Sequence, residues 1–169
     1  MPTIYRIVHE RYRDDPFSGK GGLHHRSRWA SKGQLVSYAA DHLATATLEK
    51  LAGIVRADLM TDMVYAKAEI ESEQEGVLAA DELPEDWDAL PASDATRVIG
   101  DTWLDAGSHV LLRVPSVVLP DSYYSVVLPD SYYYVVNAAH PGMSDLKVVE
   151  VAPLLLDNQV LARIGAEEE

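Results

Sequence analysis

Leu35-Val-Ser-Tyr-Ala-Ala-Asp-His-Leu-Ala-Thr-Ala-Thr-Leu-Glu49 is the stretch around which the rest of the chain can be arranged. Residues 35–39 predict a short strand, and Asp41 is a candidate N-cap for a helix that runs to about Arg56. The core stripe of this helix repeats at helical spacing and consists of Leu43, Thr47, Leu51 and Ile54. The stretch therefore predicts a strand that leads directly into an amphipathic helix.

Further elements flank this unit on both sides. Four segments have the composition of strands, namely 3–8, 63–70, 110–114 and 147–151, and Ser93 is a candidate N-cap for a second helix to about Leu104. Residues 69–88 contain nine acidic and no basic residues, which predicts a solvated loop. Strands and two helices in this irregular order predict an α+β fold with mixed or antiparallel sheets. We expect one domain over 1–169, with a frayed acidic tail over 163–169.

Composition narrows the classes of function. The chain has 169 residues, no cysteine and a net charge of -13. The missing cysteines exclude disulfides and thiolate metal sites, and the charge argues against direct nucleic-acid binding. No apolar run approaches the roughly 20 residues that span a bilayer, and the N-terminus lacks a signal-peptide core, so we expect a cytoplasmic protein without membrane contact.

The charge is unevenly distributed along the chain. Residues 1–34 carry seven of the fourteen Lys and Arg residues and three acids, a net of +4, whereas the other 135 residues carry a net of -17. Such a basic island on an acidic protein can attract a phosphate-bearing ligand. A scattered, solvated surface charge is the alternative interpretation, and the charge pattern alone favours neither.

A nine-residue unit, Ser-Val-Val-Leu-Pro-Asp-Ser-Tyr-Tyr, occurs at 116–124 and again at 125–133. Because side chains alternate along a strand, a shift by nine residues would exchange the two faces, so at least one copy must be irregular. A single duplication is not a solenoid. The repeat leaves Ser116 and Ser125 as equivalent candidates for one role. Ser116 keeps the preceding Val114-Pro115, whereas Ser125 lies twelve residues before Asn137.

Individual residues allow only weak inferences by themselves. Glu49 falls on the helix side opposite the apolar stripe and has Thr45 and Gly53 four residues away, so it has no ion-pair partner within the helix. A solvated glutamate is the simplest interpretation. The six histidines show no metal-ligand spacing, and no P-loop, dinucleotide fingerprint or nucleophile elbow is present, so we expect no metal site.

The order of several short motifs adds more. The segments that carry the match are Arg28-Trp-Ala-Ser-Lys-Gly33, Val36–Ala40, Leu43–Glu49, Leu83–Trp87, Ile99–Leu104, Val114-Pro-Ser116, Asn137–Pro141 and Leu155-Leu-Asp157. In this order and spacing, over roughly residues 3–161, they resemble the RES-domain family. Members of that family are bacterial toxins that act on NAD+ and pair with an Xre-type helix-turn-helix antitoxin, and their fold is similar to that of ADP-ribosyltransferases.

The resemblance implies an active site formed by Arg28, Tyr38, Glu49 and a serine, for which Ser116 is preferred over Ser125. Asn137 and His140 match the family's Asn-Pro-x-His-Pro segment, with Ala138 in place of its proline. With Arg28 and Tyr38, they are the residues expected to bind NAD+. The implied substrate is NAD+ itself, with no other cofactor, and the complex with the antitoxin could be oligomeric.

These residue types suit cleavage of the nicotinamide–ribose bond. Cleavage builds positive charge on the ribose, which a carboxylate stabilises more in the transition state than in the ground state. Glu49 is assigned that role, Arg28 is assigned a phosphate, Tyr38 the nicotinamide end, and the serine a hydrogen bond to ribose or nicotinamide. The acceptor of the ribosyl group could be water, phosphate or a protein. A protein ADP-ribosyltransferase and an inactive RES-like binding protein remain the alternatives.

Overall fold

A computed structural model shows the chain folded around one seven-stranded sheet, and it describes residues 1–53, 60–118 and 131–164. The sheet order is β4-β5-β6-β2-β1-β3-β7. Its strands are β1 (Thr3–His9), β2 (Val36–Ala40), β3 (Met63–Glu69), β4 (Glu75–Val77), β5 (Leu111–Val114), β6 (Tyr133–Asn137) and β7 (Lys147–Pro153). Only β4 and β5 run parallel, and the other neighbours are antiparallel. The predicted α+β class with a mixed sheet is confirmed.

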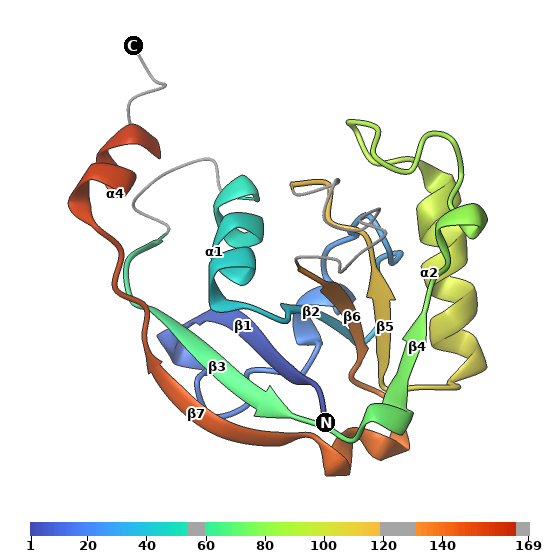
Figure 1. Ribbon diagram of the computed structural model, residues 1–169, viewed down its shortest axis with the longest axis horizontal. Coiled ribbons are helices and arrows are strands. Elements are labelled where there is room, and N and C mark those ends of the chain that lie inside the picture. Colours follow the sequence, from blue (N-terminus) through green and yellow to red (C-terminus); the bar gives the residue numbers. More distant parts are fainter. Residues whose placement is uncertain (54–59, 119–130, 165–169) are drawn as a thin grey trace.

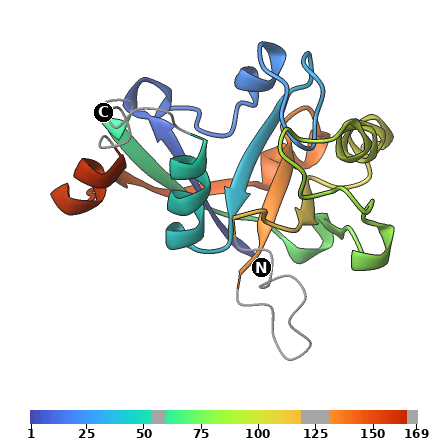
Figure 2. The ribbon, with the colours of Figure 1, turned by 90° about the horizontal axis from the view of Figure 1, so that it is seen from above.

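The helices α1 (Leu43–Ala52) and α2 (Asp94–Ala106) position the site, and α4 (Asn158–Ile164) follows the last strand. Seen from above, α1 and α2 lie on either side of β2 and β6 (Figure 2). The core of α1 joins Ile7, Ala40 and Met63, and partly buried Leu154 and Leu161 pack against it. The two helices thus pack on different parts of the sheet, and β2, β6 and β5 lie between them in the view of Figure 1.

A second core cluster fixes the α2 side of the molecule. It joins Leu104 of α2 to Leu112 and Val135 of the sheet and to Trp29, which is 2% exposed. The third cluster, which includes Ile4, Phe17, Leu111 and Val136, packs around the sheet apart from both helices. Burying these apolar side chains stabilises the fold at about 25 cal/mol per Å² of apolar surface.

Several predicted boundaries differ from the structure. Asp41 is not the N-cap of α1: His42 holds that position, and the Asp41 carboxylate instead accepts a hydrogen bond from Ser131 at 2.7 Å. Ser93 is the N-cap residue of α2, although its side chain makes no capping hydrogen bond. The predicted helix residues Ile54 and Arg56 lie outside the described residues.

Three elements were not predicted. The acidic segment 69–88 contains β4, β6 begins at Tyr133, the last residue of the repeat, and the expected frayed tail begins within α4. Residues 165–169 of that tail lie outside the described part of the chain. Within the described residues, no helix has the length and hydropathy needed to cross a membrane.

Candidate active site

The first pair of the site is Glu49 of α1 and Ser116, which follows β5. The Ser116 hydroxyl donates a hydrogen bond of 2.5 Å to Glu49 Oε1 and accepts one of 3.1 Å from the backbone N–H of Val118. Glu49 is half-buried, and Ser116 is 4% exposed. The pair therefore joins two segments 67 residues apart in the sequence.

Burial is also the main influence on the ionisation of Glu49. Desolvation raises the pKa of this carboxyl above its ordinary value, while the Ser116 hydrogen bond and the charge of Arg28 act in the opposite direction. The solvated glutamate expected from helix spacing alone is therefore wrong. Glu49 is instead a carboxyl held in a partly desolvated environment, where charge interactions are stronger than in water.

Arg28 is held by two backbone carbonyls from the segment that precedes α2. Its Nη1 donates to the Trp87 carbonyl at 2.6 Å, and its Nη2 donates to the Ala89 carbonyl at 3.1 Å. Burial lowers the pKa of Arg28, and the charges of Asp88 and Glu49 oppose that shift. An arginine remains protonated at neutral pH even so, and Arg28 therefore supplies a fixed positive charge near Glu49.

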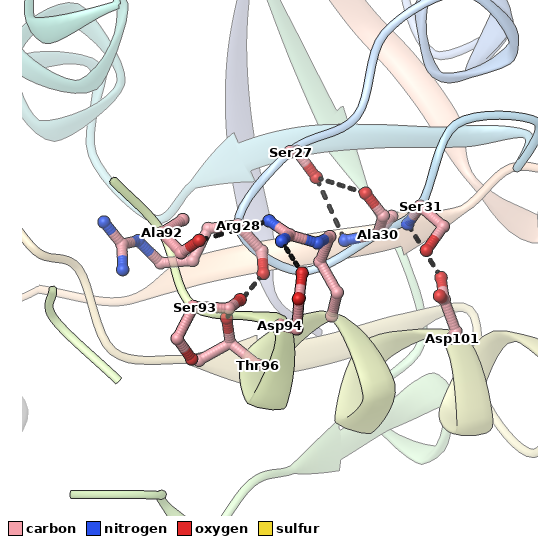
Figure 3. A network of polar contacts seen from close by, with 10 residues as sticks. Ser27, Arg28, Ala30, Ser31, Ala92, Ser93, Asp94, Thr96 and Asp101 are labelled. Atoms are coloured by element: carbon pink, nitrogen blue, oxygen red, sulfur yellow. Dashed lines mark hydrogen bonds and ion pairs between the residues drawn. The ribbon is translucent and has the colours of Figure 1, made fainter. Parts of the chain in front are cut away.

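The loop that carries Arg28 is docked on α2 through its backbone (Figure 3). The buried hydroxyl of Thr96 donates to the Arg28 carbonyl at 2.7 Å, and Asp101 accepts from the Ser31 N–H at 2.9 Å. Between them, Gly100 lies so close that an added β-carbon would be 1.7 Å from the Trp29 carbonyl oxygen. Thr96, Gly100 and Asp101 of α2 thus contact the backbone of this loop at Arg28, Trp29 and Ser31.

Tyr38 of β2 lies between this loop and β6. Its hydroxyl hydrogen-bonds Ser27, and its ring stacks on Tyr133 with centroids 5.9 Å apart and planes 8° apart. Burial raises the pKa of Tyr38 to about 12, so its phenol stays protonated at neutral pH. Tyr38 can therefore donate a hydrogen bond while its ring forms part of a flat aromatic wall.

Two cavities meet at Tyr38, Glu49 and Tyr133. The smaller has a volume of about 120 Å³ and is also lined by Ser27, Arg28, Trp29, Pro115 and Val117. The larger has a volume of about 740 Å³ and extends over β1 and α1. Glu49 thus faces both a small cavity of aromatic and cationic character and a large one of ligand-binding size.

The structure brings four of the six predicted site residues together. Arg28, Tyr38 and Glu49 line the small cavity, and Ser116 bonds to Glu49. Ser116 itself lines neither cavity, and its hydrogen bond to Glu49 is that of a residue that positions the Glu49 carboxylate. Ser125 lies outside the described residues, so the preference for Ser116 over Ser125 stays a prediction.

Asn137 and His140 are not brought to these cavities. Asn137 donates to the Leu104 carbonyl at 3.3 Å, and His140 hydrogen-bonds the Gly107 carbonyl at 2.9 Å. The Nδ1 of His140 accepts from the Gly142 N–H, which fixes Nε2 as the donor. Both residues therefore tie the end of β6 to the C-terminal end of α2, and they support the scaffold of the site.

Among the lining residues that reasoning from the sequence missed are Ser27, Tyr133 and Arg6. Ser27 and Tyr133 adjoin Tyr38, and Arg6 of β1 lines the larger cavity. The basic island in residues 1–34 was the only sequence signal for Arg6, and it did not single out one arginine. Among the described residues, no group of three His, Cys, Asp or Glu side chains is placed to hold a metal ion.

The sequence and the fold of this chain are similar to those of known toxins. A "Toxin Res" of Photorhabdus laumondii is 32% identical over 69% of this chain and 75% of the relative. A "Prs ADP-ribosylating toxin" of Sphingobium is 29% identical over 95% of this chain and 98% of the relative. A chain of the M. tuberculosis MbcT–MbcA toxin–antitoxin complex shares the fold, with a TM-score of 0.68, 15% identity, and coverage of 97% and 88% of the two chains. The RES domain pattern matches residues 3–157, and the chain therefore belongs to the RES domain family, whose relatives above are toxins.

Proposed function

We propose that this protein is the toxin of a toxin–antitoxin pair and that it cleaves the nicotinamide–ribose bond of NAD+. The observation that carries this proposal is the 2.5 Å hydrogen bond from Ser116 to Glu49, beside a cavity that Arg28 and Tyr38 also line. As the bond breaks, its electron pair leaves with nicotinamide, and the resulting positive charge on ribose is stabilised by the Glu49 carboxylate. Water or phosphate then adds its oxygen to that carbon and loses a proton.

The partner belongs to the same proposal. The net charge of -13 makes direct DNA contact unfavourable for this chain, so a helix-turn-helix antitoxin of the Xre type would supply the basic surface. The structural neighbour comes from a toxin–antitoxin complex. Co-expression with a helix-turn-helix protein encoded beside this gene tests the idea, since the two should purify together and NAD+ cleavage should fall in the complex.

The test of the activity is to incubate the purified protein with NAD+, with and without phosphate, and to identify the products by NMR. We expect free nicotinamide together with ADP-ribose or its phosphate ester. Glu49→Gln should lower the rate by about 10²- to 10³-fold, the size of effect found when one electrostatic group is removed from an active site. Glu73→Gln, a change at an exposed glutamate, is the matched control. Absence of nicotinamide release under all conditions would refute the proposal.

Protein ADP-ribosylation is the second candidate. The Sphingobium relative named as an ADP-ribosylating toxin aligns with 95% of this chain, a larger share than the 69% of the Photorhabdus relative. Incubation with NAD+ and a bacterial protein extract, followed by mass spectrometry, separates the two activities. An ADP-ribosyl group on a protein would favour transfer, and free products alone would favour cleavage.

A further inference from the structure

The larger cavity concentrates positive charge in an acidic protein. Among the described residues, its charged lining consists of Arg6, Arg11 and Lys50 against one acid, Glu49, with the histidines His9 and His25 beside them. The whole chain carries a net charge of -13. A cavity of about 740 Å³ with an excess of basic groups in such a chain favours an anionic ligand.

Arg6 occupies a position where the sheet opens. β1 and β2 pair only at Tyr5 and Ala40, and an antiparallel register continued from there would place Ile7 opposite Tyr38. Instead, Arg6 Nη1 donates to the Tyr38 carbonyl at 2.8 Å, and its Nε donates to the Pro16 carbonyl at 2.7 Å. The guanidinium thus replaces backbone pairing between the two strands and is held rigidly at the cavity wall.

Lys50 brings a second cation to the same wall. It follows Glu49 on α1 and is half-buried. Burial, and then the charge of Arg6, lowers the pKa of Lys50, and burial also lowers the pKa of Arg6. Within the described residues, neither cation forms an ion pair with a carboxylate. Among the described residues, two neighbouring and partly buried cations thus share one wall with no carboxylate bonded to either, an arrangement that a bound anion would stabilise.

We propose that Arg6 and Lys50 form a diphosphate subsite in the larger cavity, which leaves the smaller cavity with Arg28 and Tyr38 for the nicotinamide ring. This inference rests on the proposed function, because it assigns the orientation of a dinucleotide. A cavity of about 120 Å³ is too small for most of such a ligand, whereas the larger cavity of about 740 Å³ has room for a diphosphate and the groups on either side of it. Glu49 lines both cavities and so lies at the junction, where the ribose would sit.

Binding of ADP, which contains the diphosphate and has no bond to cleave, tests the subsite by calorimetry. Lys50→Met keeps the length of the side chain and removes its charge, and Lys147→Met, at an exposed lysine of β7, is the matched control. We expect Lys50→Met to weaken ADP binding about tenfold, as for loss of one charge-assisted contact, and to leave adenosine binding unchanged. Lys147→Met should bind ADP like the unmodified protein.

The outcomes separate this inference from the proposed function. Unchanged ADP affinity in Lys50→Met, or equal affinity for ADP and adenosine, would overturn the subsite even if NAD+ is cleaved. Loss of ADP affinity in a protein that releases no nicotinamide would support the subsite and refute the cleavage. Inorganic phosphate bound as tightly as ADP would show a site for free phosphate and overturn the assignment to a dinucleotide.

Arg6→Lys is the second variant. Circular dichroism verifies its folding, because Arg6 also supports β2. Unchanged ADP affinity in Arg6→Lys would count against the subsite.

Discussion

Gly100→Ala should reduce activity although Gly100 lines neither of the two cavities. An added β-carbon would lie 1.7 Å from the Trp29 carbonyl oxygen, and contacts under 3.0 Å are essentially never seen, so the two backbones must separate by about 1.3 Å. Trp29 follows Arg28, and the displacement is therefore passed directly to the guanidinium. Misplacement by about 1 Å can cost on the order of 100-fold in rate.

The assay is the initial rate of nicotinamide release, measured well below the unfolding temperature of each variant. We expect Gly100→Ala to lower kcat/KM by about 100-fold and stability by about 1–3 kcal/mol, the usual cost of overpacking. Gly21→Ala is the matched control, because a β-carbon there would meet no atom within 4 Å. Full activity in Gly100→Ala, or an equal loss in Gly21→Ala, would refute the reasoning.

Three further predictions concern the same site. Ser116→Ala removes the hydrogen bond that favours the ionised form of Glu49, so the acidic limb of the pH–rate profile should move to higher pH, and kcat should fall about tenfold. An acidic limb at the same pH would show that Ser116 does not act on Glu49. Thr96→Val should destabilise the protein by about 1–3 kcal/mol in thermal unfolding, because the Arg28 carbonyl loses its buried donor, whereas Thr96→Ser should restore most of that stability. Because folding raises the pKa of Glu49, this carboxyl contributes stability below its unfolded pKa, and the contribution is lost as pH rises through its folded pKa. Glu49→Gln should therefore make the free energy of unfolding less dependent on pH between these two pKa values. An unchanged slope of unfolding free energy against pH would contradict this.

The sequence predicted the regular parts of the fold because their patterns are local. β1, β3, β5 and β7 were found from composition, each within a few residues of its observed bounds. β4 was missed because its three residues lie in a strongly acidic segment, and its strand conformation depends on parallel pairing with β5. β6 was missed because it is a short strand that begins at the last residue of the repeat, and its conformation depends on pairing with β2 and β5.

The site divides in the same way. Arg28, Tyr38, Glu49 and Ser116 were predicted from the family resemblance, and the structure brings them together. Neither the opening of β1 from β2 nor the docking of the Arg28 loop on α2 could be read from local pattern. Both depend on contacts between residues far apart in the sequence: 32 positions for the bond from Arg6 to the Tyr38 carbonyl, and 68 for the bond from Thr96 to the Arg28 carbonyl.

The two ends of the repeat are fixed to the fold at separate places. The first residue of the first copy, Ser116, is bonded to Glu49, while Ser131 near the end of the second copy bonds to Asp41 and, at 2.5 Å, to Thr45. Because the copies are identical, replication slippage that removes one unit still leaves a serine after Pro115 and Ser-Tyr-Tyr before Tyr134. A gene with one copy of the unit and a gene with two copies therefore encode the same serines for the bonds to Glu49 and to Thr45 of α1. Gain or loss of one unit changes only the length of the segment between these two bonds.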